Sequence, residues 1–111
     1  MQVMAVQRGE ILVVTPLDPR LDAAVAIQFK DRMREFLATP SPRIVLDLTH
    51  VEFLDSSGLG AVVAVMKLFA PARTLELAAL GPSVMRVFRL TRMDRVFLIH
   101  PLVPDGFRDA V

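Results

Sequence analysis

The feature that most constrains the fold is a nearly continuous apolar run over residues 43–48, directly after Pro42. A strand with one face in water alternates polar and apolar side chains, whereas an unbroken apolar run is typical of a strand covered on both faces. Strands of that kind occur mainly in sheets that helices flank. We therefore expect residues 43–48 to form a central strand of an α/β domain.

The segments around this run alternate between strand and helix patterns. Residues 2–7 and 11–14 should form an opening hairpin, because a turn signal centred on Gly9 separates them. A helix should follow, capped by the carboxylate of Asp22 and ended near Pro40. The later elements are predicted as a helix from the loop at 55–58 to Pro71, a strand over 74–80, a short helix after the turn at 81–83, a strand over 96–99 and a terminal helical turn over 105–110. The order β, β, α, β, α, β, α, β indicates helices packed against a largely parallel sheet.

Length and charge limit what the chain can do. Its 111 residues, 53% of them apolar, suffice for one domain over residues 1–111 and leave no room for a second core. The 13 Lys and Arg residues against 12 Asp and Glu give a net charge of +1, so the composition offers no reason to expect direct nucleic-acid binding. The chain has no cysteine, which excludes disulfides, thiolate zinc sites and cysteine nucleophiles.

Membrane insertion and export are both disfavoured by the apolar pattern. The longest apolar stretch, residues 58–66, ends at Lys67 and is shorter than the roughly 20 residues that a membrane-spanning helix needs. Arg8 and Glu10 interrupt the segment that a secretory signal would need to keep apolar. We expect a cytoplasmic protein without membrane insertion.

The sequence offers no catalytic or metal-binding constellation. Neither Ser56 nor Ser57 has the glycines two places before and two places after it that a hydrolase nucleophile elbow requires. The glycines at 58 and 60 do not extend to a dinucleotide-binding pattern. The two histidines, His50 and His100, each stand alone, so we predict no metal, no cofactor and no enzymatic activity. A small hydrolase that uses Ser56 is the least favoured alternative.

The remaining concentrated signal is the segment 51–60, V-E-F-L-D-S-S-G-L-G, between the buried strand and the next helix. A carboxylate and two hydroxyls at a helix N-terminus can accept hydrogen bonds from the free backbone amides there. The same amides and the helix dipole would favour a phosphate added to one hydroxyl. Local chemistry alone favours the simpler interpretation, in which Asp55, Ser56 and Ser57 only cap the helix.

Four segments together resemble the anti-sigma-factor antagonist family, whose domains are called STAS domains. They are I-V-L-D-L at 44–48, F-L-D-S-S-G-L-G at 53–60, R-L-D-A at 20–23 and L-T-R-M-D-R-V-F at 90–97. The D-S-S-G-L-G part is the specific one, and the resemblance covers essentially the entire chain. It implies a STAS-like fold, with a mixed, largely parallel sheet of about five strands and helices packed mainly on one side.

The resemblance also implies a phosphorylation-controlled switch. In this family the unphosphorylated protein binds an anti-sigma factor that is also a serine kinase, which frees a sigma factor, and phosphorylation of a loop serine dissolves the complex. By motif position the acceptor is Ser56, and a PP2C-type phosphatase would reset the switch. The residues expected to bind the partner are Arg20, Asp22, Asp55, Ser57, Gly58 and Leu59. Capping alone is the alternative role for Asp22, and burial in the core is the alternative for Leu59.

The sequence departs from the family pattern in three places, and we expect the fold to tolerate all three departures. Pro19 and Arg92 stand where the family usually has glycine, and residues 71–73 replace a glycine-rich turn. The arginines at 86, 89, 92 and 95 form a basic row, typical of a solvated face and open to an acidic partner.

An alternative function follows from the same family resemblance. The chain could act as a STAS regulatory or structural subunit of a lipid-transport or sensory complex, with Ser56 retained but not phosphorylated. A serine kinase that co-purifies with the chain would favour the switch, whereas transporter subunits would favour the alternative.

Overall fold

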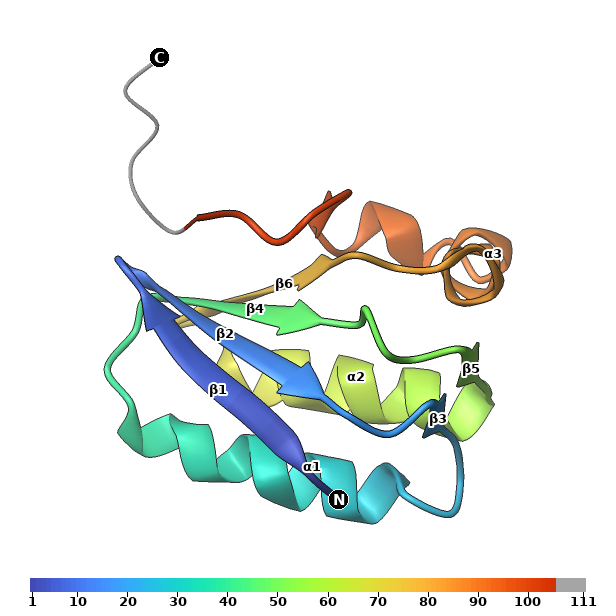
Figure 1. Cartoon of the computed structure of the whole chain (residues 1–111), viewed down its shortest axis with the longest axis horizontal. Helices are drawn as coiled ribbons and strands as arrows, with labels where there is room; N and C mark the ends of the chain where they lie inside the picture. Colours follow the sequence, from blue (N-terminus) through green and yellow to red (C-terminus); the bar gives the residue numbers. More distant parts are fainter. Residues whose placement is uncertain (106–111) are drawn as a thin grey trace.

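Five strands form the main sheet of the computed structural model, which describes residues 1–105 (Figure 1). Their order across the sheet is β1 (Val3–Arg8), β2 (Ile11–Pro16), β4 (Arg43–Asp47), β6 (Thr74–Ala78) and β7 (Ile99–His100). β1 is antiparallel to β2, and the pairs β2–β4, β4–β6 and β6–β7 are all parallel. The expectation of a mixed, largely parallel sheet of about five strands is confirmed.

The central position of β4 follows from its side chains. Ile44, Val45 and Leu46 are each 0% exposed, which is what an unbroken apolar run predicts for a strand covered on both faces. The opening hairpin is also confirmed: Arg8 pairs with Ile11, and the turn between them is possible because Gly9 has a left-handed φ of 56°.

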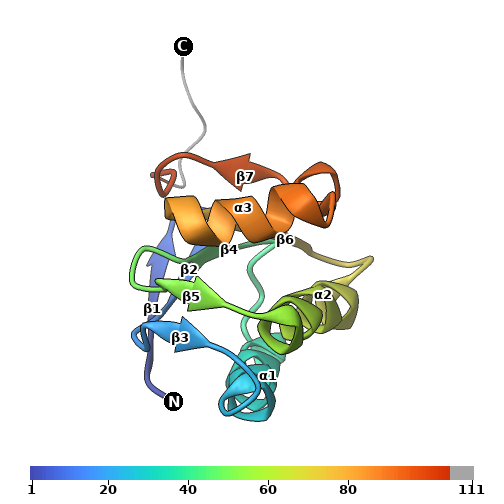
Figure 2. The same cartoon turned by 90° about the vertical axis from the view of Figure 1, so that its right-hand side faces the viewer.

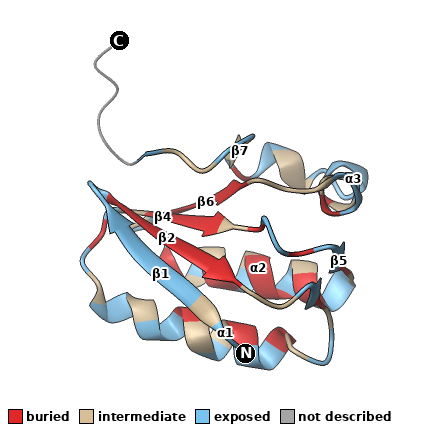
Figure 3. Cartoon of the chain, in the orientation of Figure 1, coloured by how far each residue is buried: buried red, intermediate tan, exposed pale blue. Residues whose placement is uncertain are grey.

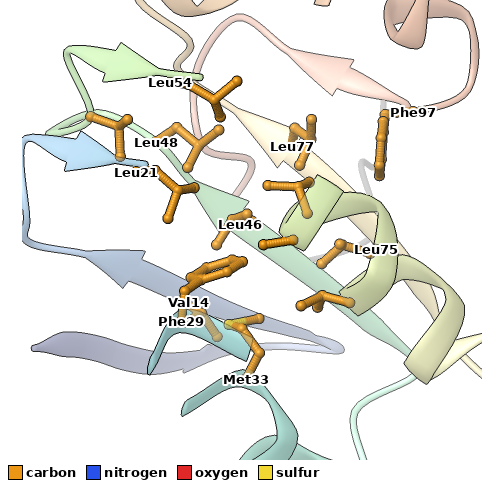
Figure 4. Packing of buried hydrophobic residues seen from close by; sticks show 14 of the residues in the cluster. Val14, Leu21, Phe29, Met33, Leu46, Leu48, Leu54, Leu75, Leu77 and Phe97 are labelled. Carbon is orange, nitrogen blue, oxygen red and sulfur yellow. The ribbon is translucent and has the colours of Figure 1, made fainter. Parts of the chain in front are cut away.

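The helices lie mainly on one side of the sheet (Figures 1 and 2). They are α1 (Ala26–Arg34), continued by the 3-10 turn η1 (Glu35–Ala38), then α2 (Ser56–Phe69), α3 (Pro82–Leu90) and the 3-10 turn η2 (Met93–Arg95). The large core joins one face of the sheet to these helices, with Val14 and Leu46 meeting Phe29 and Met33 of α1 (Figure 4). The opposite face carries a smaller cluster of Ile11, Val13, Val45 and Ala78, against which Val103 packs.

The start of α1 differs from the sequence-based prediction. Its N-cap residue is Val25, whose side chain makes no capping hydrogen bond. Asp22 lies three residues earlier, where its Oδ1 accepts a hydrogen bond from the Ala24 amide at 3.1 Å and its carbonyl accepts one from the Val25 amide. The prediction that Asp22 caps this helix was wrong, because the carboxylate is used in the turn that precedes it.

The end of the described chain also differs from the prediction. The last strand was expected over 96–99, but β7 is only Ile99–His100, because η2 uses Met93–Arg95 and Phe97 turns into the core. The Phe97 ring packs edge-on against Phe88, with ring centroids 5.9 Å apart. A helical turn was predicted over 105–110. Apart from residue 105, this segment lies outside the described residues.

Arg92, which stands where the family usually has glycine, has a backbone conformation that favours glycine. Arg92 follows the C-cap residue of α3, Thr91, and has a left-handed φ of 61°. Helices commonly end with glycine at this place because a side chain is strained there. The fold tolerates arginine, as expected.

Among residues 1–105, no helix is both long enough and apolar enough to span a membrane.

Candidate functional site

A short second sheet joins two segments that are far apart in the sequence. β3 (Arg20–Leu21) runs parallel to β5 (Phe53–Leu54), with Arg20 opposite Phe53 and Leu21 opposite Leu54 (Figure 2). The Pro19 carbonyl accepts hydrogen bonds from the amides of Glu52 and Phe53 at 2.7 and 3.1 Å. This pair was not predicted, because strands of two residues carry no periodic pattern.

Asp55 fixes the start of α2 through both oxygens of its carboxylate. As the N-cap residue, it accepts a hydrogen bond at Oδ1 from the Gly58 amide at 2.9 Å. Its Oδ2 accepts one from the Ala23 amide at 3.3 Å, so the same side chain also holds the segment after β3. One carboxylate therefore ties the two segments of the candidate site together.

Ser56 and Ser57 occupy the first two positions of α2, and both are exposed. Neither hydroxyl forms a hydrogen bond with another described residue, and the N-cap side chain of α2 is that of Asp55. The first amides of a helix have no partner within the helix and carry the positive end of its dipole. Two hydroxyls without a hydrogen-bond partner among the described residues thus lie at the positive end of the helix dipole.

Gly58 shapes the loop by having no side chain. A Cβ atom on Gly58 would come within 2.0 Å of the Leu21 carbonyl oxygen. Gly58 is buried and its amide donates to Asp55. Its place among the partner-binding residues stays a prediction, and any such role would act through the shape of the loop.

Arg20, Asp22 and Phe53 form a surface beside the serines. The Arg20 Nε donates to Asp22 Oδ2 at 3.0 Å, and the guanidinium carbon lies 4.2 Å from the centroid of the Phe53 ring. Phe53 is 40% exposed, which leaves much of its ring open to a partner. Phe53 was not predicted as a site residue, although its position two residues before the D-S-S-G segment was the available signal.

The Leu59 side chain is neither fully buried nor fully exposed. It is partly buried and packs against the large core from the first turns of α2. The structure thus brings Arg20, Asp22, Asp55, Ser56, Ser57, Gly58 and Leu59 into one region built from two segments. The basic row on α3 and η2 belongs to another surface: Arg86, Arg89, Arg92 and Arg95 are all exposed.

A second polar cluster lies within the sheet, and no pattern in the sequence predicted it. The Glu76 carboxylate, in a residue only 5% exposed, accepts hydrogen bonds from Arg43 Nε and Nη2, each at 2.7 Å. His100 Nε2 also lies 2.7 Å from Glu76 Oε1. Burial alone would raise the pKa of the Glu76 carboxyl, but the hydrogen bonds from Arg43 and His100 outweigh it and hold that pKa below its ordinary value.

No group of three or more His, Cys, Asp or Glu side chains within residues 1–105 is arranged to hold a metal ion.

Comparison with known proteins assigns a family to this arrangement. A model of the STAS domain family matches residues 2–106. The structure is similar to that of an anti-sigma factor antagonist from Mycobacterium paratuberculosis, with a TM-score of 0.82 and 25% identity over 92% of this chain and 86% of that chain. It is also similar to the TM1081 protein of Thermotoga maritima, with a TM-score of 0.79 and 27% identity over 91% and 87% of the two chains.

The same fold occurs within a much larger protein. The murine anion transporter Slc26a9 is similar over 88% of this chain and 17% of its own, with a TM-score of 0.75 and 16% identity. At that identity the likeness concerns the fold alone.

Proposed function

This chain belongs to the STAS domain family, and from that premise we propose that it is an anti-sigma-factor antagonist switched by phosphorylation of Ser56. Residues 1–111 act as a single STAS domain. The unphosphorylated form binds an anti-sigma factor that is also a serine kinase, and this frees a sigma factor in the cytoplasm. A PP2C-type phosphatase resets the switch. The chain itself is a kinase substrate and a binding protein, without a cofactor or direct contact to nucleic acid.

The observation that carries the proposal is the exposed, unengaged hydroxyl of Ser56 beside the Asp55 cap. A kinase can reach this oxygen without moving a core side chain. The phosphate would then meet the free amides of the first turn and the positive end of the helix dipole, which stabilise an anion. Because Asp55 keeps its cap, α2 does not need to unfold for the reaction.

The same geometry explains how the modification would release a partner. A phosphoserine adds about −1.5 to −2 charges. Asp55 directly precedes Ser56 in the chain, and Asp22 lies on the segment that Asp55 holds in place. An interface over this region would have to desolvate the phosphate next to carboxylates, which weakens binding.

The surface proposed to bind the anti-sigma factor combines charge with apolar area. Arg20 and Asp22 supply opposite charges in one ion pair, and Phe53 supplies an exposed ring beneath the guanidinium. Leu59 adds the part of its side chain that the core does not cover. Aromatic and arginine side chains are the groups that most often carry binding energy in interfaces.

Phosphate transfer onto the purified chain tests the proposal. A tagged chain would be used to recover its anti-sigma factor kinase from the host, and the pair would be incubated with ATP. We expect one phosphate per chain, lost in Ser56→Ala and kept in the matched variant Ser57→Ala. Phosphate on Ser57 would overturn the choice of acceptor. No transfer, with equal partner affinity of Ser56→Ala and Ser56→Asp, would instead support a regulatory or structural subunit of a transport or sensory complex.

A further inference from the structure

In the part of the chain that the structure describes, β1 has one strand neighbour and its other edge is open. It is the first strand in the order of the sheet, and within residues 1–105 it pairs only with β2. The Gln2 carbonyl accepts a hydrogen bond from the Leu17 amide, on the β2 side. Backbone groups of successive residues in a strand point to alternate edges. The amides and carbonyls of Val3, Ala5 and Gln7 therefore point away from the sheet.

This edge lacks the features that usually protect an edge strand. Natural edges carry proline, inward-pointing charges or bulges that prevent pairing with another chain. β1 has the sequence V-M-A-V-Q-R, with its single charge at the last residue, and it pairs with β2 without interruption. Five of its six residues are exposed, including Met4 at 52% and Val6 at 44% (Figure 3).

We propose that a second copy of this chain pairs with the first along β1, in antiparallel orientation, about a two-fold axis at Ala5. In this register Ala5 faces Ala5 and Val3 faces Gln7 of the other copy. All three residues with outward backbone groups then lie in hydrogen-bonded pairs. A shift by two residues in either direction would oppose Val3 to Gly9 or Gln7 to Met1, which lie outside the strand.

The side chains are self-complementary in the same register. Met4 would stand opposite Val6 of the other copy, and cross-strand pairs of this kind stabilise a sheet. Val6 lies beside Val13 of its own sheet, so the two pairs would extend the apolar cluster on that face. Arg8 would face Gln2, and no charge would face its like. This symmetry favours a second copy over an unrelated strand.

The assembly would be a continuous ten-stranded sheet made of two five-stranded halves. The edge of one strand buries less surface than a standard protein interface, so we expect a reversible dimer that depends on concentration. The Ser56 region lies beyond Pro16, at the Val3 end of β1. Antiparallel pairing would put the two Ser56 regions at opposite ends and leave both open, so the inference does not depend on the proposed function.

Disulfide trapping tests the position of the axis. The chain has no cysteine, so a single one can be introduced by Ala5→Cys. Two residues in a hydrogen-bonded antiparallel pair have Cα atoms about 5.5 Å apart, within the range of a disulfide. Mild oxidation should therefore give a covalent dimer from Ala5→Cys. The matched variant Ala72→Cys, at an exposed alanine in the loop between α2 and β6, should stay monomeric.

A charge-swap experiment tests the pairing without a covalent bond. Ala5→Lys and Ala5→Glu each place like charges opposite each other at the axis, and the dissociation constant should rise roughly tenfold or more in sedimentation experiments. An equimolar mixture of the two variants should restore the dimer. Dimers of both variants as tight as wild type, or cross-linking of Ala5→Cys no better than that of Ala72→Cys, would overturn the proposal. Phosphorylation of Ser56 would be unaffected by either result.

Discussion

Two glycines near the start of α2 differ in what surrounds them, and this difference makes a matched test. Gly58→Ala would place a Cβ atom 2.0 Å from the Leu21 carbonyl oxygen. The backbone of α2 or of β3 would have to move to relieve this clash. We expect a loss of about 1 to 3 kcal/mol in the free energy of unfolding, as for other overpacked positions. Urea denaturation measures this change.

Gly60→Ala is the control for that substitution. A Cβ atom on Gly60 has no neighbour within 4 Å, and the residue is exposed inside the helix. Alanine there should stabilise the protein by about 0.5 to 1 kcal/mol, because it restricts the unfolded chain. Equal effects of the two substitutions would contradict the contact between α2 and β3 on which the geometry of the serine loop rests.

At the level of elements, the Glu76 cluster connects β4, β6 and β7 and should make stability depend on pH. The pKa of Glu76 is lowered in the folded protein from an ordinary value of 4.5. The unfolded chain therefore binds the proton more tightly. The stabilising contribution is present above about pH 4.5 and is lost as the pH falls through the lower pKa of the folded state.

Glu76→Gln tests this contribution. At neutral pH the substitution should lower the free energy of unfolding by about 1 to 3 kcal/mol, because the buried hydrogen bonds from Arg43 and His100 lose their charged acceptor. The difference from wild type should shrink in acid, when both proteins carry an uncharged group there. Unfolding curves measured at several pH values, with the exposed Glu52→Gln as control, give the comparison. A difference that stayed constant with pH would refute the assignment.

For the whole molecule, the sequence predicted the parts that repeat a pattern over many residues. The apolar run at 43–48 became the buried β4, and the alternation of elements became the parallel part of the sheet. The pair β3–β5 was missed because each strand has only two residues, and its position depends on carbonyls and amides of distant segments. Glu76 was missed because an acidic residue in a strand does not indicate its partners on neighbouring strands.

Only part of the candidate site could be predicted from the sequence. The D-S-S-G segment identified the start of α2, with Asp55 as its cap. The spatial neighbours of this start come from the segment around Arg20, which the residues alone do not connect to it. The left-handed Arg92 shows a related limit, because sequence preferences describe averages and packing can hold a strained residue.

The final prediction concerns the switch in the intact protein. Ser56→Asp should weaken binding of the recovered anti-sigma factor by roughly tenfold or more, since it places a negative charge beside Asp55 within the proposed interface. Ser56→Ala should bind as wild type does. A carboxylate at the start of a helix is compatible with the helix dipole, so neither variant should change the unfolding curve by much. Calorimetric titration of each variant measures the affinity.

Ser83 provides the matched control, because it is an exposed serine in the first turn of α3. Ser83→Asp adds the same charge to the same protein at the start of another helix. If Ser83→Asp weakened binding as much as Ser56→Asp, net charge rather than position would explain the effect, and the switch would lose its support. Weakening by Ser56→Asp alone would mean that the anti-sigma factor covers the start of α2, since the two variants differ only in the helix that carries the charge.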